Sequence, residues 1–376
     1  MSSTLEAIGM KCIVNRSQLV SLISVAQRIV PAKAILPILS NVLIEAGDGM
    51  ITLSATDLNV SLQASMPAQV ELAGAITLPA RRFFQLIREL STPMIEITVE
   101  GNIAQIRAGS SHFKVNGIDK SEFPPIPSQM TGLTVDVKSD DLREMLIRTS
   151  FAAAREEVGK PACVSVLMKI EKKVATFVAT DGKRLARFQK SIEIDQDITA
   201  VVPLKAVQEM IDLLSFDETA TLSFLDGKIL LKVGPVCLIA KLIGLPYPDY
   251  ARAFVDQNEL TIINIHKEEW VALLRQIALF TSETSHSARF TFKDGLMRLR
   301  AQSPEYGEGE VEMAVDVAKE LDIAFNPHYV MEALKHCKGD VVRLGICHPY
   351  MPGLILDPAS VGVDFVVMPM RLKEDD

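Results

Sequence analysis

The chain has 376 residues, of which 48% are hydrophobic and 23% charged, and its formal net charge is −8 at pH 7. This composition is typical of a globular protein and excludes an intrinsically disordered one. No apolar run reaches the roughly 18 residues that a membrane-spanning helix needs, and the opening residues lack a signal-peptide pattern, so we expect a cytoplasmic protein. Taken alone, the acidic charge argues against nucleic-acid binding, which depends on neutralising phosphates.

The predicted elements recur along the chain at a spacing of 124 residues. Helical periodicity marks residues 17–30, 80–90, 140–155, 204–214, 267–280 and 327–338, and strand patterns include residues 40–46 and 164–170. Residues that share the spacing are Pro79, Pro203 and Pro327, which open one set of helical runs, and Leu22, Leu146 and Trp270, which lie in the other. Trp270 falls on the apolar face of its helix and is expected in the core.

Each repeat contains a helix, several strands, a Pro-started helix and further strands that end in a Pro-rich linker. This order predicts an α+β domain with helices on one face of an antiparallel sheet. Three copies fill nearly the whole chain. We therefore predict domains at residues 1–131, 132–257 and 258–376.

The sequence offers no metal site and no catalytic constellation. Its five cysteines form no CxxC pair, which predicts free buried thiols in a reducing compartment. The six histidines lack metal-ligand spacing, and no phosphate-binding Gly-rich loop is present. Asp57 and Asp181 stand in equivalent "ATD" segments, which favours turn-forming aspartates over a catalytic pair. We expect no cofactor, and an enzyme with active sites between the repeats has little support.

The repeat suggests what three similar domains in a row are for. A domain of this length is about 35 Å across, so three closed into a ring leave a hole of only about 5 Å, whereas six leave about 35 Å. A DNA duplex is roughly 20 Å wide. Only a dimer of this chain can therefore encircle DNA, and we expect the joint between subunits to imitate the junctions within a chain.

The charge distribution agrees with a DNA-facing set of helices. The six helical stretches carry twelve Lys or Arg against nine Asp or Glu, which leaves −11 for the rest of the chain. Helices that mix solvated charges are common, so charge alone leaves both interpretations open. The residues that we expect to face phosphates are Lys33, Arg81, Arg82, Arg88, Arg148, Arg155, Lys205, Arg275, Lys335 and Lys338.

Several segments together resemble one family over nearly the whole chain. They are "LPILSNVLIEA" at residues 36–46, "ATDLNVSL" at 55–62, "LPARRFFQLIREL" at 78–90, "ATDGKRLA" at 179–186, "VPLKAVQEM" at 202–210, "YPDY" at 247–250 and "VVMPMRL" at 366–372. These segments are similar to those of the bacterial DNA polymerase III beta subunit, the sliding clamp family.

The resemblance implies a non-catalytic processivity factor for DNA replication and repair, built from three clamp-type domains. It also implies a head-to-tail homodimer, a six-domain ring that holds double-stranded DNA without sequence preference in the bacterial cytoplasm, at the nucleoid. The implied partners are DNA polymerase subunits, an ATP-driven clamp loader and other proteins with a clamp-binding motif. No membrane partner is implied.

The resemblance further implies a groove for partner peptides between the second and third domains. By position it would be formed by Lys160, Cys163, Thr180, Gly182, Lys183, Arg184, Leu185, Pro248, Arg252, Ala253, Asn326, Tyr329, Val366, Val367, Met368, Pro369, Met370, Arg371 and Leu372. The residues at 160, 163 and 183 depart from the family's usual pattern. Without the resemblance, "VVMPMRL" would be interpreted as a last edge strand; methionines suit a surface that adapts to several partners.

Two other functions remain open at this stage. One is a DNA-independent scaffold whose groove recruits peptides. The other is an additional copy of the clamp with altered partner or inhibitor sensitivity.

Overall fold

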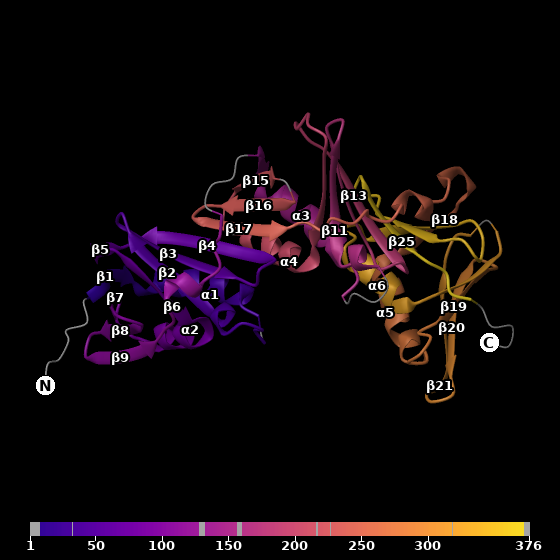
Figure 1. Ribbon diagram of the computed structural model, residues 1–376. Helices are drawn as coiled ribbons and strands as arrows, with labels where there is room; N and C mark the ends of the chain where they lie inside the picture. Colours follow the sequence, from indigo (N-terminus) through magenta and orange to yellow (C-terminus); the bar gives the residue numbers. More distant parts are fainter. Residues whose placement is uncertain are drawn as a thin grey trace, which may run out of the picture. The chain divides into compact units, whose positions relative to one another are not determined.

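The computed structural model describes residues 8–31, 33–127, 132–155, 160–215, 217–225, 227–317 and 319–371. The described segments follow the three predicted repeats, each with two helices and eight or nine strands (Figure 1). Across these residues, every helix is too short or too polar to span a membrane. All strand pairs recorded between them are antiparallel, which confirms the predicted α+β class.

The elements of the first repeat are β1 (Ile8–Asn15), α1 (Arg16–Ile29), β2 (Asn41–Gly47), β3 (Met50–Thr56), β4 (Val60–Pro67), β5 (Gln69–Leu72), β6 (Gly74–Pro79), α2 (Ala80–Glu89), β7 (Met94–Glu100), β8 (Ile103–Ala108) and β9 (Ser111–Asn116). Those of the second are β10 (Leu133–Lys138), α3 (Ser139–Ser150), β11 (Ser165–Glu171), β12 (Val174–Thr180), β13 (Arg184–Ser191), β14 (Ile198–Pro203), α4 (Leu204–Leu213), β15 (Thr219–Leu225), β16 (Lys228–Val233) and β17 (Val236–Lys241). Those of the third are β18 (Thr261–His266), α5 (Lys267–Ala278), β19 (Ala288–Lys293), β20 (Leu296–Ser303), β21 (Gly307–Ala314), β22 (Leu321–Phe325), α6 (Pro327–Lys335), β23 (Val341–Ile346), β24 (Gly353–Leu356) and β25 (Val363–Val367). Short 3-10 turns lie at Pro37–Ser40, Lys120–Glu122, Pro161–Cys163, Tyr250–Ala253 and Gln257–Glu259.

The sheets cross the boundaries between repeats. One eight-stranded sheet has the order β10-β15-β16-β17-β4-β3-β2-β6, and another has the order β14-β11-β12-β13-β25-β24-β23-β18. In Figure 1, β4 runs beside β17 and β13 runs beside β25. Two smaller sheets remain, with the orders β5-β1-β7-β8-β9 and β21-β20-β19-β22.

Because the sheets cross the repeats, the chain packs into two compact units rather than three. The first comprises residues 1–140 and 208–242, and the second comprises residues 141–207 and 243–376. The central repeat is thus divided between the units. The spacing describes the repeated order of the elements, whereas hydrogen bonding between β4 and β17, and between β13 and β25, decides which of them pack together.

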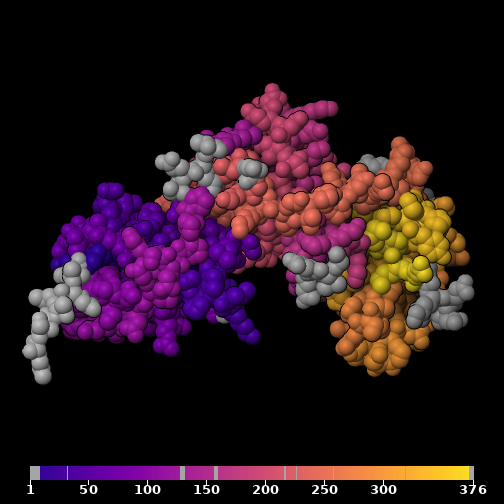
Figure 2. Space-filling model, in the orientation of Figure 1, coloured from indigo at the N-terminus to yellow at the C-terminus, as the bar shows by residue number. Residues whose placement is uncertain are grey.

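The core of each unit lies between its helices and its sheets. In the first unit, α1 packs on α2 and against β3 and β4; in the second, α5 packs on α6 (Figure 1). Trp270 is fully buried, as predicted. In the space-filling view, the last strands, in yellow, lie against orange residues of the third repeat (Figure 2).

The repeat is less regular than a constant spacing of 124. Leu19, Leu142 and Trp270 are the fourth residues of α1, α3 and α5, and all three are buried, whereas Leu22 is only half-buried. Leu19 and Leu142, rather than the residues 124 apart, therefore take the helix position of Trp270. Loops of different length shift the register without moving the apolar face of the helix.

The described cysteines are all free, as predicted. Three of them are buried, and the other two are half-buried: Cys12, Cys163 and Cys337, then Cys237 and Cys347. Burial raises the pKa of Cys12 and Cys237 to about 11, so these thiols stay protonated and pack as small apolar groups.

Candidate functional site

A groove of about 620 Å³ opens in the second compact unit beside the end of β25. Its walls come from the β12–β13 turn, the turns that begin at Pro161 and Tyr250, and the loop between β23 and β24. The residues that line it are Lys160, Cys163, Thr180, Asp181, Gly182, Arg184, Leu185, Pro248, Asp249, Tyr250, Arg252, Ala253, Tyr350, Met351, Pro352, Val366 and Met368.

The floor of the groove is apolar and continuous with the core. Leu185 and Val366 are both buried, and they belong to a cluster with Val178 and Leu354 against which Tyr247 and Tyr250 pack. The Tyr247 hydroxyl donates to the carbonyl of Val178 at 3.3 Å, and burial raises the pKa of this phenol. A floor anchored in this way is preformed, which lowers the ordering cost of binding an apolar side chain.

One edge of the groove is the "ATD" turn between β12 and β13. The Asp181 Oδ1 atom accepts the N–H groups of Lys183 at 2.9 Å and Arg184 at 3.0 Å, and Gly182 has φ +84°. Asp57 accepts the N–H groups of Asn59 and Val60 in the same way in the first repeat. The prediction of turn-forming aspartates is confirmed.

Because residue 182 is glycine, no side chain projects from the tip of this turn into the groove. The equivalent residue of the first repeat is Leu58, which holds φ +78° and places a side chain at the tip of its turn. At Gly182 a Cβ would meet nothing within 4 Å, so the space above the turn is open. The second repeat therefore presents backbone to an incoming ligand where the first presents a leucine.

Arg184 supports the wall of the groove, because its charge is paired within the chain and is not free to bind a ligand. Its guanidinium pairs with Asp181 at 3.1 Å and with Glu332 of α6, and it donates to the Phe151 carbonyl at 3.0 Å. It also lies over the ring of Tyr329, 4.6 Å from the centroid. The side chain is nearly fully buried, so it ties β13 to α6.

The terminal "VVMPMRL" is not an edge strand. Val366 and Val367 belong to β25, which pairs with β13 on one side and β24 on the other. Beyond β25, the Met368 N–H donates to the Lys183 carbonyl at 2.9 Å, and the Met370 N–H donates to the Ala324 carbonyl at 2.8 Å. Met368 is 39% exposed and lines the groove.

Of the nineteen residues predicted for the groove, the cavity brings eleven together. They are Lys160, Cys163, Thr180, Gly182, Arg184, Leu185, Pro248, Arg252, Ala253, Val366 and Met368. Seven others do not line it: Lys183, Asn326, Tyr329, Val367, Pro369, Met370 and Arg371. Leu372 falls outside the described residues. Asn326 is instead the N-cap of α6, where its side chain accepts the His328 N–H at 2.9 Å.

Sequence reasoning missed six lining residues. Three of them, Tyr350, Met351 and Pro352, form the loop after β23, and Tyr350 and Met351 are exposed. A signal for this loop was present in the sequence. The segment "HPYMPG" places large apolar residues beside prolines without a helical or strand period, which predicts a loop with apolar side chains. Asp181, Asp249 and Tyr250 are the others.

The predicted phosphate-facing cations are exposed with one exception. Lys33, Arg81, Arg82, Arg88, Arg155, Lys205, Arg275, Lys335 and Lys338 are all exposed. Arg148 is buried; it pairs with Glu144 at 3.2 Å and with Asp357 at 3.4 Å. Its guanidinium is committed to these carboxylates, so we remove Arg148 from the phosphate-facing set.

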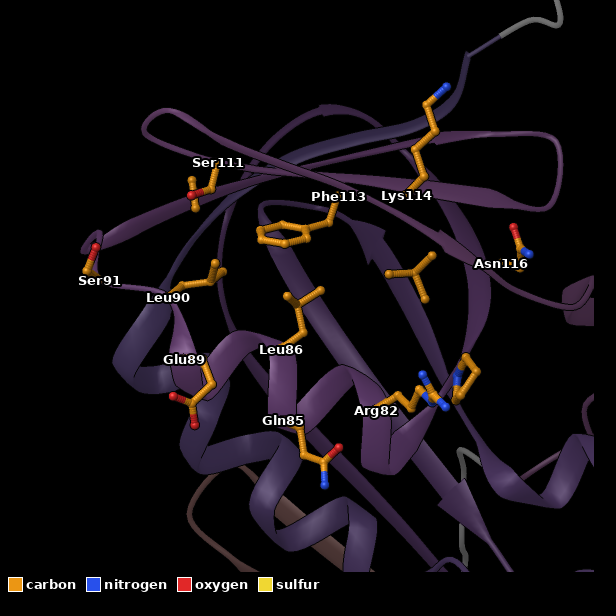
Figure 3. A pocket seen from close by; sticks show the side chains of 13 residues that line it. Arg82, Gln85, Leu86, Glu89, Leu90, Ser91, Ser111, Phe113, Lys114 and Asn116 are labelled. Carbon is orange, nitrogen blue, oxygen red and sulfur yellow. The ribbon is translucent and has the colours of Figure 1, made fainter.

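A second cavity, of about 760 Å³, lies in the first unit between α2 and β9. Figure 3 shows the Phe113 ring facing Leu86 across it, with Arg82 at one end. Phe113 is 38% exposed although it is aromatic. Both β9 and β21 are edge strands of the smaller sheets.

Comparison with known proteins identifies the family. Residues 10–127, 136–249 and 253–371 match the N-terminal, central and C-terminal domains of the DNA polymerase III beta subunit. The chain belongs to the DNA polymerase III beta subunit family. It is a sliding clamp of DNA replication, as the resemblance implied.

Relatives of this clamp cover nearly its whole length. The chain is 40% identical to the beta sliding clamp of Chlamydia muridarum over 97% of this chain and 100% of the relative, and 29% identical to that of Vibrio cholerae over 96% and 100%. Among solved structures, the Thermotoga maritima beta subunit superposes with a TM-score of 0.90 at 27% identity, covering 97% of this chain and 100% of that one. The Pseudomonas aeruginosa clamp bound to griselimycin gives 0.90 at 26% identity, with the same coverage.

Proposed function

We propose that this sliding clamp is a head-to-tail homodimer that encircles double-stranded DNA and carries partner proteins in the groove beside β25. The observation that carries the proposal is the number of strands in each sheet and the repeats from which they come. Two sheets have eight strands, and each joins four strands of one repeat to four of the next. The two smaller sheets are the halves of a third.

The missing partner strands can be named from the repeat. Within the chain, β4 pairs with β17, and β13 pairs with β25. The strand of the third repeat that corresponds to β4 and β13 is β21, and the strand of the first that corresponds to β17 and β25 is β9. Both are edge strands in the described part of the chain. Pairing β21 of one copy with β9 of another joins the five-stranded and four-stranded sheets into one nine-stranded sheet at each of two joints, so neither β9 nor β21 remains an edge strand.

DNA is held by topology, so weak contacts suffice. The nine exposed cations of the phosphate-facing set make sequence-independent contacts that permit sliding. A formal net charge of −8 over the whole chain discourages binding of DNA elsewhere on the surface. The clamp itself is non-catalytic, and loading energy comes from a separate ATP-driven loader.

Partners dock short peptides with apolar anchors over the floor formed by Leu185 and Val366, beside the exposed Met368. Two or three anchors gain roughly 1.5–3 kcal/mol each before ordering costs, which predicts micromolar affinity. DNA polymerase subunits, the clamp loader and other proteins with a clamp-binding motif share this groove and exchange on it. The eleven lining residues named above are the proposed peptide contacts.

We propose that the chain consists of three clamp domains, one for each repeat, at residues 1–131, 132–257 and 258–376. The first boundary falls in the gap between the matched ranges 10–127 and 136–249, whereas the third matched range, 253–371, begins a few residues before the second boundary.

The test is retention on DNA. The protein is loaded onto nicked circular DNA with a bacterial clamp loader and separated by gel filtration, and the DNA is then linearised. We expect the protein to stay with the circle and to leave after linearisation. Equal retention on circular and linear DNA would contradict encirclement, and no retention on either would favour the DNA-independent scaffold.

A further inference from the structure

A third cavity, of about 360 Å³, lies in the second unit and shares no lining residue with the groove beside β25. Its charged lining residues are Glu144 and Arg148 of α3, Lys190 of β13 and Lys338, which follows α6. We propose that this cavity binds the phosphate group of a small molecule, either inorganic phosphate or a phosphate monoester. The inference goes beyond the proposed function and does not depend on the homodimer.

The first argument is an incomplete set of hydrogen bonds on Arg148. This side chain is 5% exposed, and its two terminal nitrogens donate to Glu144 at 3.2 Å and to Asp357 at 3.4 Å. Charge-assisted hydrogen bonds of this kind are usually about 2.7–2.9 Å long, so neither carboxylate is close. The Nε atom is buried and has no hydrogen-bond partner among the described residues. Buried donors are normally paired, so this N–H group suits an acceptor that comes from outside the chain.

Asp357 is held by the backbone at its distance from Arg148. Its buried carboxylate accepts the N–H groups of Lys338 at 2.6 Å, Gly339 at 3.2 Å and Ala359 at 3.0 Å. These three bonds already stabilise the negative charge of the carboxylate. The Arg148 guanidinium therefore keeps positive charge and a donor for a ligand.

Other arginines of the second unit use their Nε atoms within the chain. The Nε of Arg184 donates to Asp181 at 3.1 Å, and that of Arg187 donates to Asp364 at 2.9 Å. The Nε of Arg148 lines up with no such carboxylate in the part of the chain that the structure describes. A phosphate oxygen would take the place beside Arg148 that a carboxylate oxygen takes beside the other two.

The second argument is the charge of the lining, which consists of three cations and one carboxylate. Lys190 pairs with Asp141 at 2.6 Å, Lys338 pairs with Glu144 at 2.6 Å, and both lysine side chains are partly exposed. An ammonium group has three donors, so each lysine retains donors for a second acceptor. The excess of positive charge favours an anion over a water molecule as the partner of the Arg148 Nε.

The cavity is preformed because its walls are tied together. The Gln189 N–H of β13 donates to the Gly362 carbonyl at 2.7 Å, which fixes the loop between β24 and β25. Gly362 has φ +84°, and a Cβ there would lie 2.2 Å from the Gln189 carbonyl oxygen, so only glycine allows this approach. Small-molecule sites usually measure about 300–1,000 Å³, and this cavity lies at the lower end of that range. Its size and rigidity suit a small phosphate compound.

The depth of Arg148 distinguishes this site from the contacts proposed for DNA. The residue is only 4% exposed, and its guanidinium carbon lies 5.6 Å from the centre of the buried Phe188 ring. A backbone phosphate of duplex DNA is fixed on the surface of a cylinder roughly 20 Å wide and cannot enter a cavity of this size. A free phosphate or a small monoester can enter it, with Lys190 and Lys338 at the mouth.

A matched pair of lysines tests the site in the full-length protein. Lys190 and Lys169 each have a side chain that is 36% exposed and paired with one carboxylate, but only Lys190 lines the cavity. Isothermal titration calorimetry with inorganic phosphate should show one site per chain. Lys190→Gln should weaken this binding about 10-fold, whereas Lys169→Gln should leave it within about twofold of wild type. Equal weakening by both variants would overturn the proposal, because it would mean attraction to the net charge alone.

Arg148→Lys tests the buried donor, because it keeps the charge and removes the Nε–H group. It should weaken phosphate binding about 10-fold, with Trp270 fluorescence confirming that the second unit is folded at the temperature of the titration. Adenosine monophosphate is the second probe. Binding of this ester at least as tight as that of phosphate would identify a monoester as the ligand, and binding of phosphate alone would identify the inorganic ion. Absence of binding by both probes at about 10 mM would overturn the proposal while leaving the proposed function intact.

Discussion

Two arginines line the same groove, and the structure predicts a large loss of stability from replacing one and a small loss from replacing the other. Arg184 is buried among Asp181, Glu332 and the ring of Tyr329. Arg252 has a side chain that is 87% exposed, and it pairs only with Asp249 among the described residues, at 2.9 Å. Replacing each by alanine therefore distinguishes a buried arginine that stabilises the fold from an exposed arginine at the edge of the groove.

The magnitudes differ because of burial. Arg184→Ala leaves two carboxylates without their cation, and breaking a buried pair in this way costs about 3–5 kcal/mol. For a unit of this size each kcal/mol corresponds to about 2–4 °C, so the melting temperature should fall by about 6–20 °C. Arg252→Ala removes an exposed ion pair worth at most about 0.5–1 kcal/mol. It should lower the melting temperature by no more than about 4 °C.

A single tryptophan makes the assay specific. Trp270 is the only one in the sequence and is fully buried in the second unit, so its fluorescence reports the unfolding of the unit that contains the groove. Thermal melts of both variants, followed by titration with a fluorescent partner peptide, complete the measurement. We expect Arg252→Ala to keep its stability and to change only the salt dependence of binding. Equal melting of the two variants would refute the argument that Arg184 holds β13 to α6.

Three further changes test the groove and the unit around it. Removing residues 368–376 should abolish peptide binding in a fluorescence titration while the dimer persists, whereas removing 373–376 should alter only its salt dependence. Arg148→Glu should lower the free energy of unfolding by about 3–5 kcal/mol, while Arg155→Glu should impair loading onto DNA at unchanged stability. Burial lowers the pKa of His336 to about 4. As pH falls from about 6.5 to 4, this histidine therefore gains its proton in the unfolded chain before it does so in the folded one. The free energy of unfolding of the second unit should fall by about 1–2 kcal/mol over this range. His336→Phe should remove that loss in urea titrations at the two pH values.

The sequence by itself determined the elements and the family. Helical period located all six α-helices of the described residues because the apolar face of a helix is a local property, and Pro79 and Pro203 mark the ends of β6 and β14. The "ATD" turns were predictable because an aspartate that caps its own turn needs only its neighbours. The groove could be located by resemblance, since its residues fall in specific motifs.

Only the tertiary structure decided which residues of the groove face outward. Asn326 and Tyr329 lie behind the wall, and Tyr350 and Met351 enter from a loop without periodicity. Arg148 looks like any helical cation until Asp357, distant in the sequence, is brought beside it. The division into two units likewise depends on which strands meet. Strand pairing and the burial of charge are non-local, because they depend on segments separated by more than a hundred residues, and no local pattern encodes them.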